Sequence, residues 1–234
     1  MLQSLKNPIS SMRKREWILW GISLTVVILS NICAGKIDPV NLAATCIGVT
    51  ALILVARGDV WGQILTVVFA VLYGITAWRF RYWGEILTYL GMSAPIAAMA
   101  VVSWLKHPYQ SDRNEVKIHR LTGRQKVFMF LSATVVTGLF YFILAALDTP
   151  NLVFSTLSVT TSYLASYLTF QRNSWYGFAY ACNDMVLIIL WVLASMEDIT
   201  YLPMIACFAM FLINDLYGFI SWKKREQTQR TGRT

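Results

Sequence analysis

The residues best suited to chemistry in this 234-residue chain are two asparagine-aspartate dipeptides, Asn183-Asp184 and Asn214-Asp215, each set in a long apolar stretch. A carboxylate near the centre of a bilayer costs about 2.5 to 3.5 kcal/mol on insertion scales, so such residues usually face a cavity or a partner. A carboxylate can balance a cation, and an amide both donates and accepts hydrogen bonds. The dipeptides therefore predict a polar cavity inside a membrane protein.

Aromatic residues accompany both dipeptides at helical spacing. At 100° per residue, Tyr180 and Asn183 share a helix face with Asp184 on its flank, and Phe211 shares a face with Asn214. Aromatic faces stack on flat rings and attract positive charge. This lining suits a small aromatic ligand, neutral or cationic. The alternative is that the amides and carboxylates only hydrogen-bond neighbouring helices and fix their packing.

A hydroxyl-rich stretch over residues 152–170 offers partners for these side chains. Serine and threonine in membrane helices often bond their own i−4 carbonyl or let helices approach closely, so most of these hydroxyls are expected to be structural. Thr161, Ser162 and Gln171 are the candidates for substrate contact.

The composition assigns the chain to the membrane, because 56% of its residues are hydrophobic and only 14% are charged. Eight apolar segments approach the length that crosses a hydrocarbon core of about 30 Å. They cover residues 17–33, 40–56, 60–78, 86–105, 127–147, 152–170, 175–195 and 201–222. The expected fold is an all-α, multi-pass membrane protein.

The distribution of lysine and arginine predicts the orientation. If the N-terminus is cytoplasmic, 17 of the 20 basic residues fall in cytoplasmic segments, which satisfies the positive-inside rule with both termini inside. The same placement explains the net charge of +8 without a nucleic-acid partner. The first apolar segment has no convincing cleavage site and is expected to stay as a helix.

The tryptophans indicate an internal repeat. Three of them lie at offsets of 114, 113 and 118 residues from three others: Trp61, Trp78 and Trp104 match Trp175, Trp191 and Trp222. An aromatic belt at the membrane interfaces explains their depth but not the matched pairs. Because each repeat has three crossings, a single linking helix gives both repeats the same orientation, an arrangement known among transporters.

The repeat divides the chain into five parts. Residues 1–37 form the N-terminus and an extra helix, 38–106 the first repeat, 107–148 a basic loop and linker helix, 149–224 the second repeat, and 225–234 a tail. The offsets place Phe69 opposite Asn183 and Ile96 opposite Asn214. The polar pocket is therefore expected to be built mostly by the second repeat.

Several short motifs carry a resemblance to a known family. In the second half they are Thr160-Thr161-Ser162, Trp175, Tyr180, Asn183, Trp191, Asn214, Tyr217-Gly218 and Trp222; in the first half they are Arg57-Gly58, Tyr73 and Gly84-Glu85. Together they resemble the PnuC family of bacterial vitamin transporters, especially its nicotinamide riboside members. Arg57 and Trp83 stand where the family has lysine and tyrosine, and the two aspartates are less typical of it.

The resemblance implies a fold and a mode of transport. The fold is a core of seven helices, three plus one plus three, with the architecture of the SWEET sugar transporters in the opposite orientation and an additional N-terminal helix. The protein would be a homotrimer in the bacterial inner membrane. It would catalyse facilitated diffusion of nicotinamide riboside, made one-way by phosphorylation inside the cell.

The substrate site is expected to include Trp175, Tyr180, Asn183, Asp184, Asn214, Tyr217, Thr161 and Gln171. By position, Trp175, Asn183 and Asn214 are the best matches to the family's binding region. The aromatic residues would stack on the pyridinium ring, the asparagines would pair with the carboxamide or ribose, and Asp184 or Asp215 would supply negative potential.

Other functions stay open from the residues alone. Thiamine, riboflavin or a nucleoside could be the substrate, and a membrane carboxylate could relay protons in a symporter. An enzyme with Asp184 and Asp215 as acid and base is conceivable. However, His107 and His119 lie in the basic loop and the four cysteines lack metal or redox spacing, so no catalytic residue, metal or cofactor is expected.

Overall fold

The computed structural model describes residues 7–33, 39–79, 83–109, 115–197, 199 and 202–232, and the regular elements in these ranges are helical. The α-helices are α1 (Lys14–Cys33), α2 (Pro39–Ala56), α3 (Val60–Arg79), α4 (Trp83–Ile86), α5 (Ala94–Lys106), α6 (Gly123–Ala146), α7 (Leu152–Phe170), α8 (Tyr176–Glu197) and α9 (Leu202–Thr231). A 3-10 turn, Ile9–Ser11, precedes α1, and a π-helix, Leu87–Ser93, joins α4 to α5.

Each apolar segment that the sequence predicts contains a helix, and α7 begins and ends where predicted. The segment 86–105 differs because it combines a π-helix with α5. Pro95 stands at the start of α5 and has no N–H to donate, while the Ala94 N–H bonds Tyr89 O, five residues back. The last segment also differs, since α9 continues past Trp222 to Thr231.

Five helical stretches in the described part of the chain are long and apolar enough to cross a membrane: Lys14–Cys33, Leu87–Lys106, Gly123–Ala146, Tyr176–Glu197 and Met204–Thr231. Two shorter apolar helices, Leu42–Ala56 and Val60–Thr76, lie in α2 and α3. The remaining long helix, α7, is rich in serine and threonine, which lowers its hydropathy. The protein is therefore a multi-pass helical membrane protein.

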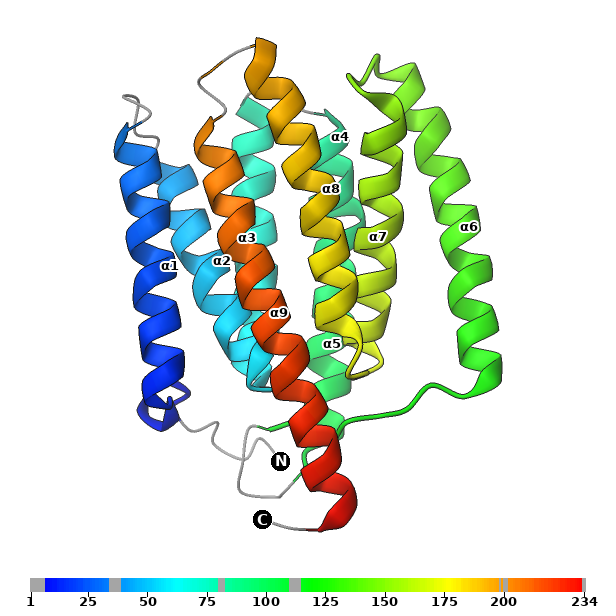
Figure 1. Ribbon diagram of the computed structural model, residues 1–234. Coiled ribbons are helices and arrows are strands. Elements are labelled where there is room, and N and C mark those ends of the chain that lie inside the picture. Colours follow the sequence, from blue (N-terminus) through cyan, green and yellow to red (C-terminus); the bar gives the residue numbers. More distant parts are fainter. Residues whose placement is uncertain are drawn as a thin grey trace.

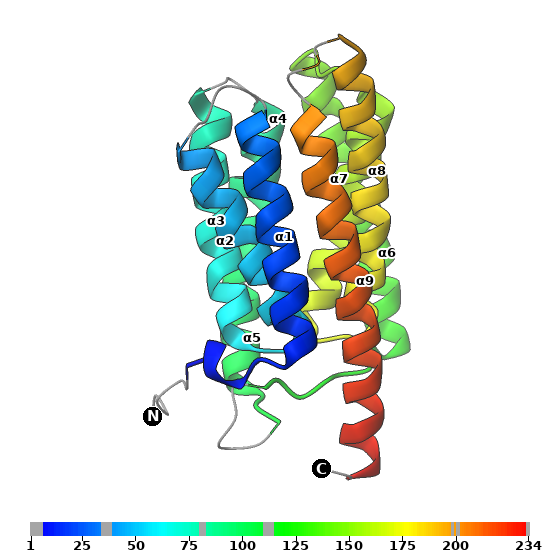
Figure 2. The same cartoon turned by 60° about the vertical axis from the view of Figure 1, so that its left-hand side comes forward.

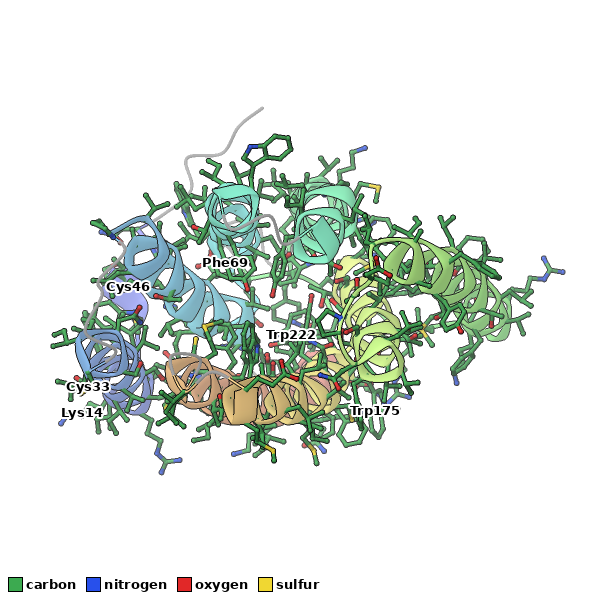
Figure 3. The ribbon with its side chains drawn as sticks, turned by 90° about the horizontal axis from the view of Figure 1, so that it is seen from above. Lys14, Cys33, Cys46, Phe69, Trp175 and Trp222 are labelled. Carbon is green, nitrogen blue, oxygen red and sulfur yellow. The ribbon has the colours of Figure 1, made fainter. Side chains whose placement is uncertain are left out.

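The helices run roughly parallel to one axis (Figure 1). Seen from above, α2, α3, α5, α7, α8 and α9 surround a central region, with α1 and α6 outside at opposite ends (Figure 3). The outer helix α1 packs on α2 and α9, and α6 packs on α7. The first turn of α1 and the last turns of α9 lie at the same end, where α9 extends beyond the bundle (Figure 2).

The turn between α2 and α3 has the same hydrogen bonds as the turn between α7 and α8, 114 residues later. Asp59 Oδ1 accepts from the Trp61 N–H at 3.0 Å, and Asn173 Oδ1 accepts from the Trp175 N–H at 3.1 Å. The residue before each capping side chain has positive φ, +70° at Gly58 and +58° at Arg172. Two distant segments therefore share one local backbone geometry.

Two matched tryptophans tie these halves together. The Trp104 indole on α5 donates to Thr169 O on α7 at 3.0 Å, and the Trp222 indole on α9 donates to Val55 O on α2 at 2.8 Å. Val55 and Thr169 are again 114 residues apart. Both indoles are buried, and their rings lie 5.5 Å apart. Each half thus bonds the other through its third helix.

The loop before α6 connects the two turns to the end of α9. The Val116 N–H donates to Gly58 O and the His119 N–H donates to Arg172 O, both at 2.9 Å. Arg120 pairs with Glu226 on α9, and burial lowers the pKa of the Arg172 guanidinium. The loop therefore fixes this end of both halves.

Candidate functional site

A cavity of about 110 Å³ lies in the centre of the ring of helices. Because a single water position needs roughly 10 to 15 Å³, the cavity holds several waters or part of a small ligand. Its walls come from α2, α3, the π-helix, α5, α7, α8 and α9. The lining residues are Gly48, Ala51, Leu52, Val55, Gln63, Thr66, Phe69, Ala70, Tyr89, Ser93, Ile96, Ala97, Ala100, Ser162, Ser166, Thr169, Tyr176, Tyr180, Asn183, Asp184, Leu187, Phe208, Phe211 and Asp215.

The helices α2 and α7 contribute matched positions to opposite walls with different chemistry. On α2 the lining residues include Gly48, Leu52 and Val55, and the residues 114 positions later on α7 are Ser162, Ser166 and Thr169. The first half therefore presents an apolar surface where the second half presents hydroxyl groups.

A similar contrast holds at two further positions on α3 and α8, although Gln63 and Thr66 of α3 also line the cavity. Phe69 and Ala70 on α3 correspond to Asn183 and Asp184 on α8, at an offset of 114 residues. Phe69 points toward the centre of the bundle (Figure 3). Its ring lies 6.4 Å from that of Phe211 and 5.8 Å from that of Tyr89. The amide and carboxylate thus face an aromatic wall.

Asp184 and Asp215 both line this cavity, and only 3% and 4% of their surfaces are exposed. Their carboxyl groups lie close enough to interact. Asp184 Oδ2 is buried and has no hydrogen-bond partner in the described part of the chain. The lining includes no lysine, arginine or histidine among the described residues. The centre of the protein therefore holds a carboxyl pair without a countercharge.

Asn183 and Tyr180 are held by α7. The Thr161 hydroxyl donates to Asn183 Oδ1 at 2.8 Å, and Asn183 lines the cavity. The Tyr180 hydroxyl and Ser166 Oγ lie 3.0 Å apart. The sequence-predicted residues Tyr180, Asn183 and Asp184 thus come together on one wall, with Thr161 directly behind them.

Asn214 and Tyr217 contact the extra helix α1 and do not line the cavity. Asn214 Nδ2 donates to Ser23 Oγ at 2.9 Å and to Met210 O at 2.7 Å, while its Oδ1 is buried without a partner. The Tyr217 hydroxyl donates to Glu16 Oε1 at 3.2 Å. Both side chains of α9 therefore join α1 to the second half.

Trp175 and Gln171 lie at the α7–α8 turn, away from the cavity. Trp175 is 49% exposed and lies on the outer side of the bundle (Figure 3). The Lys223 ammonium is 4.1 Å from its ring centroid, a cation–π distance. Gln171 Nε2 donates to the Tyr167 hydroxyl at 3.3 Å. In this conformation neither side chain reaches the cavity.

Sequence reasoning missed several features of the site. The carboxyl pair depends on how α8 and α9 pack, which no spacing within one helix reveals. Tyr89 and Ser93 reach the cavity from the π-helix, and Pro95 was the available signal. Ser23 and Glu16 are the polar side chains of α1 that meet α9, and the sequence offers no pattern that pairs them.

The profile of a family described as nicotinamide mononucleotide transporter matches residues 38–224 of the chain. Two relatives, both named nicotinamide riboside transporter PnuC, are 24% identical to it. The protein from Neisseria mucosa aligns over 77% of this chain and 70% of its own length. The protein from Haemophilus influenzae aligns over 94% of this chain and 95% of its own length.

The fold also resembles a solved structure, the crystal structure of the vitamin B3 transporter PnuC. The TM-score is 0.79, the sequence identity is 21%, and the match covers 94% of each chain. At 21% identity, this structural similarity supports the fold alone. The cavity itself combines aromatic faces, an amide donor and a carboxyl pair, which can hold a flat, polar and positively charged solute.

Proposed function

We propose, because this chain belongs to the nicotinamide mononucleotide transporter family, that it carries nicotinamide riboside across the membrane. The family consists of transporters, so the chain is a multi-pass transporter and not an enzyme. The names of the relatives suggest the substrate. The observation that carries the proposal is the central cavity, with its carboxyl pair, Asn183 and aromatic rings.

The chemistry of nicotinamide riboside fits this lining. It is a pyridinium cation with a carboxamide and a ribose. The ring would stack between aromatic side chains such as Tyr180 and Phe211, and the Asn183 amide would pair with the carboxamide or a ribose hydroxyl. Asp184 and Asp215 would balance the positive charge.

The other sequence-predicted residues receive different roles. Thr161 orients the Asn183 amide through its hydrogen bond. Asn214 and Tyr217 hold α1 against α9. Trp175 and Gln171 stand at the α7–α8 turn, and we propose that they meet the substrate on its way to the cavity when the halves move apart.

The architecture is proposed as two parallel repeats of three helices, 38–106 and 149–224, with 107–148 as linker, 1–37 as an extra helix and 225–234 as a tail. The matched turns and the reciprocal tryptophan bonds support this seven-helix, SWEET-like core. The boundary at residues 37 and 38 lies outside the described residues. The basic residues support cytoplasmic termini in the bacterial inner membrane.

Transport is proposed to be facilitated diffusion in a homotrimer, with intracellular phosphorylation of the vitamin making uptake one-way. The α6 helix presents large exposed apolar side chains, including Phe128, Phe130, Leu131, Val135 and Phe142. This surface supports contact with lipid or with a second subunit.

A second candidate is proton-coupled or facilitated transport of thiamine, and the carboxyl pair is the observation that favours it. Thiamine is also an aromatic cation, and membrane carboxylates can relay protons.

Uptake by the purified protein in liposomes tests the proposal. Radiolabelled nicotinamide riboside should enter saturably and stop at the outside concentration, with or without a pH gradient. Thiamine at excess should compete poorly. Accumulation above the outside concentration would contradict facilitated diffusion, and saturable uptake of thiamine alone would favour the second candidate.

A further inference from the structure

Gln63 is a polar residue of the first half that lines the central cavity. It lies on α3, and only 3% of its surface is exposed. Its side-chain amide makes no hydrogen bond to another residue in the described part of the chain. Because a buried amide without a partner is costly, such groups usually bond to water or to a ligand. The donor and acceptor of the Gln63 amide are therefore available to the contents of the cavity.

The matched position in the second half has no side chain. It is Gly177 of α8, 114 residues after Gln63. A Cβ atom there would lie 2.6 Å from Asp215 O and 2.6 Å from the Phe219 nitrogen of α9. The helices α8 and α9 thus pack too closely at this level to admit a side chain. The Gln63 amide is therefore a polar addition of the first half and no part of the scaffold that the halves share.

Gln63 lies at a different level of the cavity from the carboxyl pair. The helices α3 and α8 begin at the same end of the bundle, where the loop before α6 bonds the turn that precedes each helix. Gln63 is three residues beyond the start of α3, and Asp184 is eight residues beyond the start of α8. At 1.5 Å per residue, the two levels differ by roughly 8 Å along the bundle.

The two ends of the cavity differ in polarity. Thr169 is the last residue but one of α7 and Tyr176 is the first of α8, so both line the cavity at its Gln63 end. Toward the opposite end, beyond the carboxyl pair, the lining residues of α8 and α9 are Leu187 and Phe208. The Gln63 end is thus polar and uncharged, whereas the opposite end is apolar on these helices.

We propose that Gln63 is a specificity-determining residue that hydrogen-bonds the ribose of the substrate. A pyridinium ring beside Asp184 and Asp215 leaves the sugar to extend toward the polar, uncharged end. One amide can accept from one hydroxyl group and donate to another, which suits the adjacent hydroxyls of a ribose. The carboxamide then stays with Asn183. This inference rests on the proposed function, since it requires a riboside as the substrate.

Two ligands that differ only at the sugar test this contact on the purified protein. Nicotinamide riboside and 1-methylnicotinamide share the pyridinium ring and the carboxamide, but the second carries a methyl group in place of the ribose. The variant Q63L removes the amide and keeps a buried side chain. We expect Q63L to weaken binding of the riboside about tenfold and to change binding of 1-methylnicotinamide by less than about twofold, both measured by calorimetry.

Two further variants assign the effect to the sugar. Q227L is the matched control, because Gln227 is exposed near the end of α9, and it should bind both ligands as the wild type does. N183A should weaken both ligands by a similar factor, because both carry the carboxamide. Retained binding of 1-methylnicotinamide, together with a melting curve, shows that Q63L is folded.

The outcomes separate the ribose contact from the proposed function. Q63L affinities that equal those of the wild type, or that fall by the same factor for both ligands, overturn the contact and leave the proposed function intact. Equal affinity of the wild type for the two ligands also overturns it, because the ribose would then contribute nothing. An absence of saturable riboside binding to the folded wild type overturns the proposed function and the contact with it.

Discussion

The two three-helix halves, α2–α3–α5 and α7–α8–α9, share their backbone devices and differ in what they present to the cavity. The capped turns and the reciprocal indole bonds of Trp104 and Trp222 are the same in both. The lining is apolar in α2 and hydroxyl-bearing in α7, and alanine in the first half corresponds to aspartate in the second. The second half therefore supplies the carboxyl pair and Asn183, while the first half supplies the apolar surface of α2 together with Gln63 and Thr66 of α3.

This difference has an energetic meaning. Trp104 and Trp222, which bond across the bundle, are the same residue type in both halves because both must pack. Asp184 and Asp215 do not help the fold, since a buried charge without a partner destabilises it by several kcal/mol or forces protonation. Polar residues that appear in one half alone are thus candidates for function, and the halves serve as internal controls for each other.

The largest effect is expected from giving the second half the residues of the first. In D184A/D215A the dissociation constant for nicotinamide riboside should rise at least about 100-fold, or roughly 2.7 kcal/mol, because the cation loses its counterion. The thermal midpoint in detergent should hold or rise, because a buried carboxyl pair is replaced by apolar groups. Calorimetry and a melting curve on the same preparation measure both.

The amide of Asn183 should give the next largest effect. N183A should weaken binding about tenfold, the value of roughly one good hydrogen bond to a polar ligand. T161V removes only the donor that orients the amide and should have a smaller effect. Phe69, the matched wall residue, provides the control: F69L should weaken binding less than N183A. An N183A affinity equal to that of the wild type would argue against this ligand.

The matched tryptophans test the common scaffold. W104F and W222F each remove an indole donor from a carbonyl that keeps one backbone donor, the Arg172 N–H for Thr169 O and the Gly58 N–H for Val55 O, so each should lower stability by about 0.5 to 1.5 kcal/mol. Similar losses, measured by unfolding in mixed detergent micelles, are expected because the two bonds are equivalent. A large loss in one and none in the other would break the correspondence between the halves.

The smallest effect is expected at the contact with α1, which has no equivalent in the first half. S23A removes the hydroxyl that accepts from Asn214 and should lower stability by about 1 kcal/mol. Affinity for the substrate should change by less than about threefold, because neither side chain lines the cavity. A tenfold loss of affinity would instead show that Asn214 acts on the substrate.

The sequence predicted the helices well because the bilayer requires long apolar stretches with internal hydrogen bonds, and such stretches are visible one at a time. Tryptophan spacing also predicts the two repeats, which stay a prediction that the matched turns support. The sequence did not predict the π-helix or the extension of α9 to Thr231. Both depend on local backbone hydrogen bonds and on contacts with the loop before α6.

The site was only partly predictable, for a physical reason. Helical spacing correctly places Tyr180, Asn183 and Asp184 on one wall, because it describes the faces of a single helix. Helical spacing does not show which neighbouring helix packs against that face. Asn214 and Tyr217 are covered by α1, and Trp175 turns outward beside Lys223. The pairing of Asp184 with Asp215 likewise depends on how α8 packs against α9.

The most direct test of this difference between the halves is the thermal stability of the purified protein with nicotinamide riboside. At a hundred times its dissociation constant, the ligand should stabilise the wild type by about 2.7 kcal/mol. At the same concentration D184A/D215A should show almost no shift. Equal shifts in the two proteins, or none in the wild type, would contradict a cation site built by the second half.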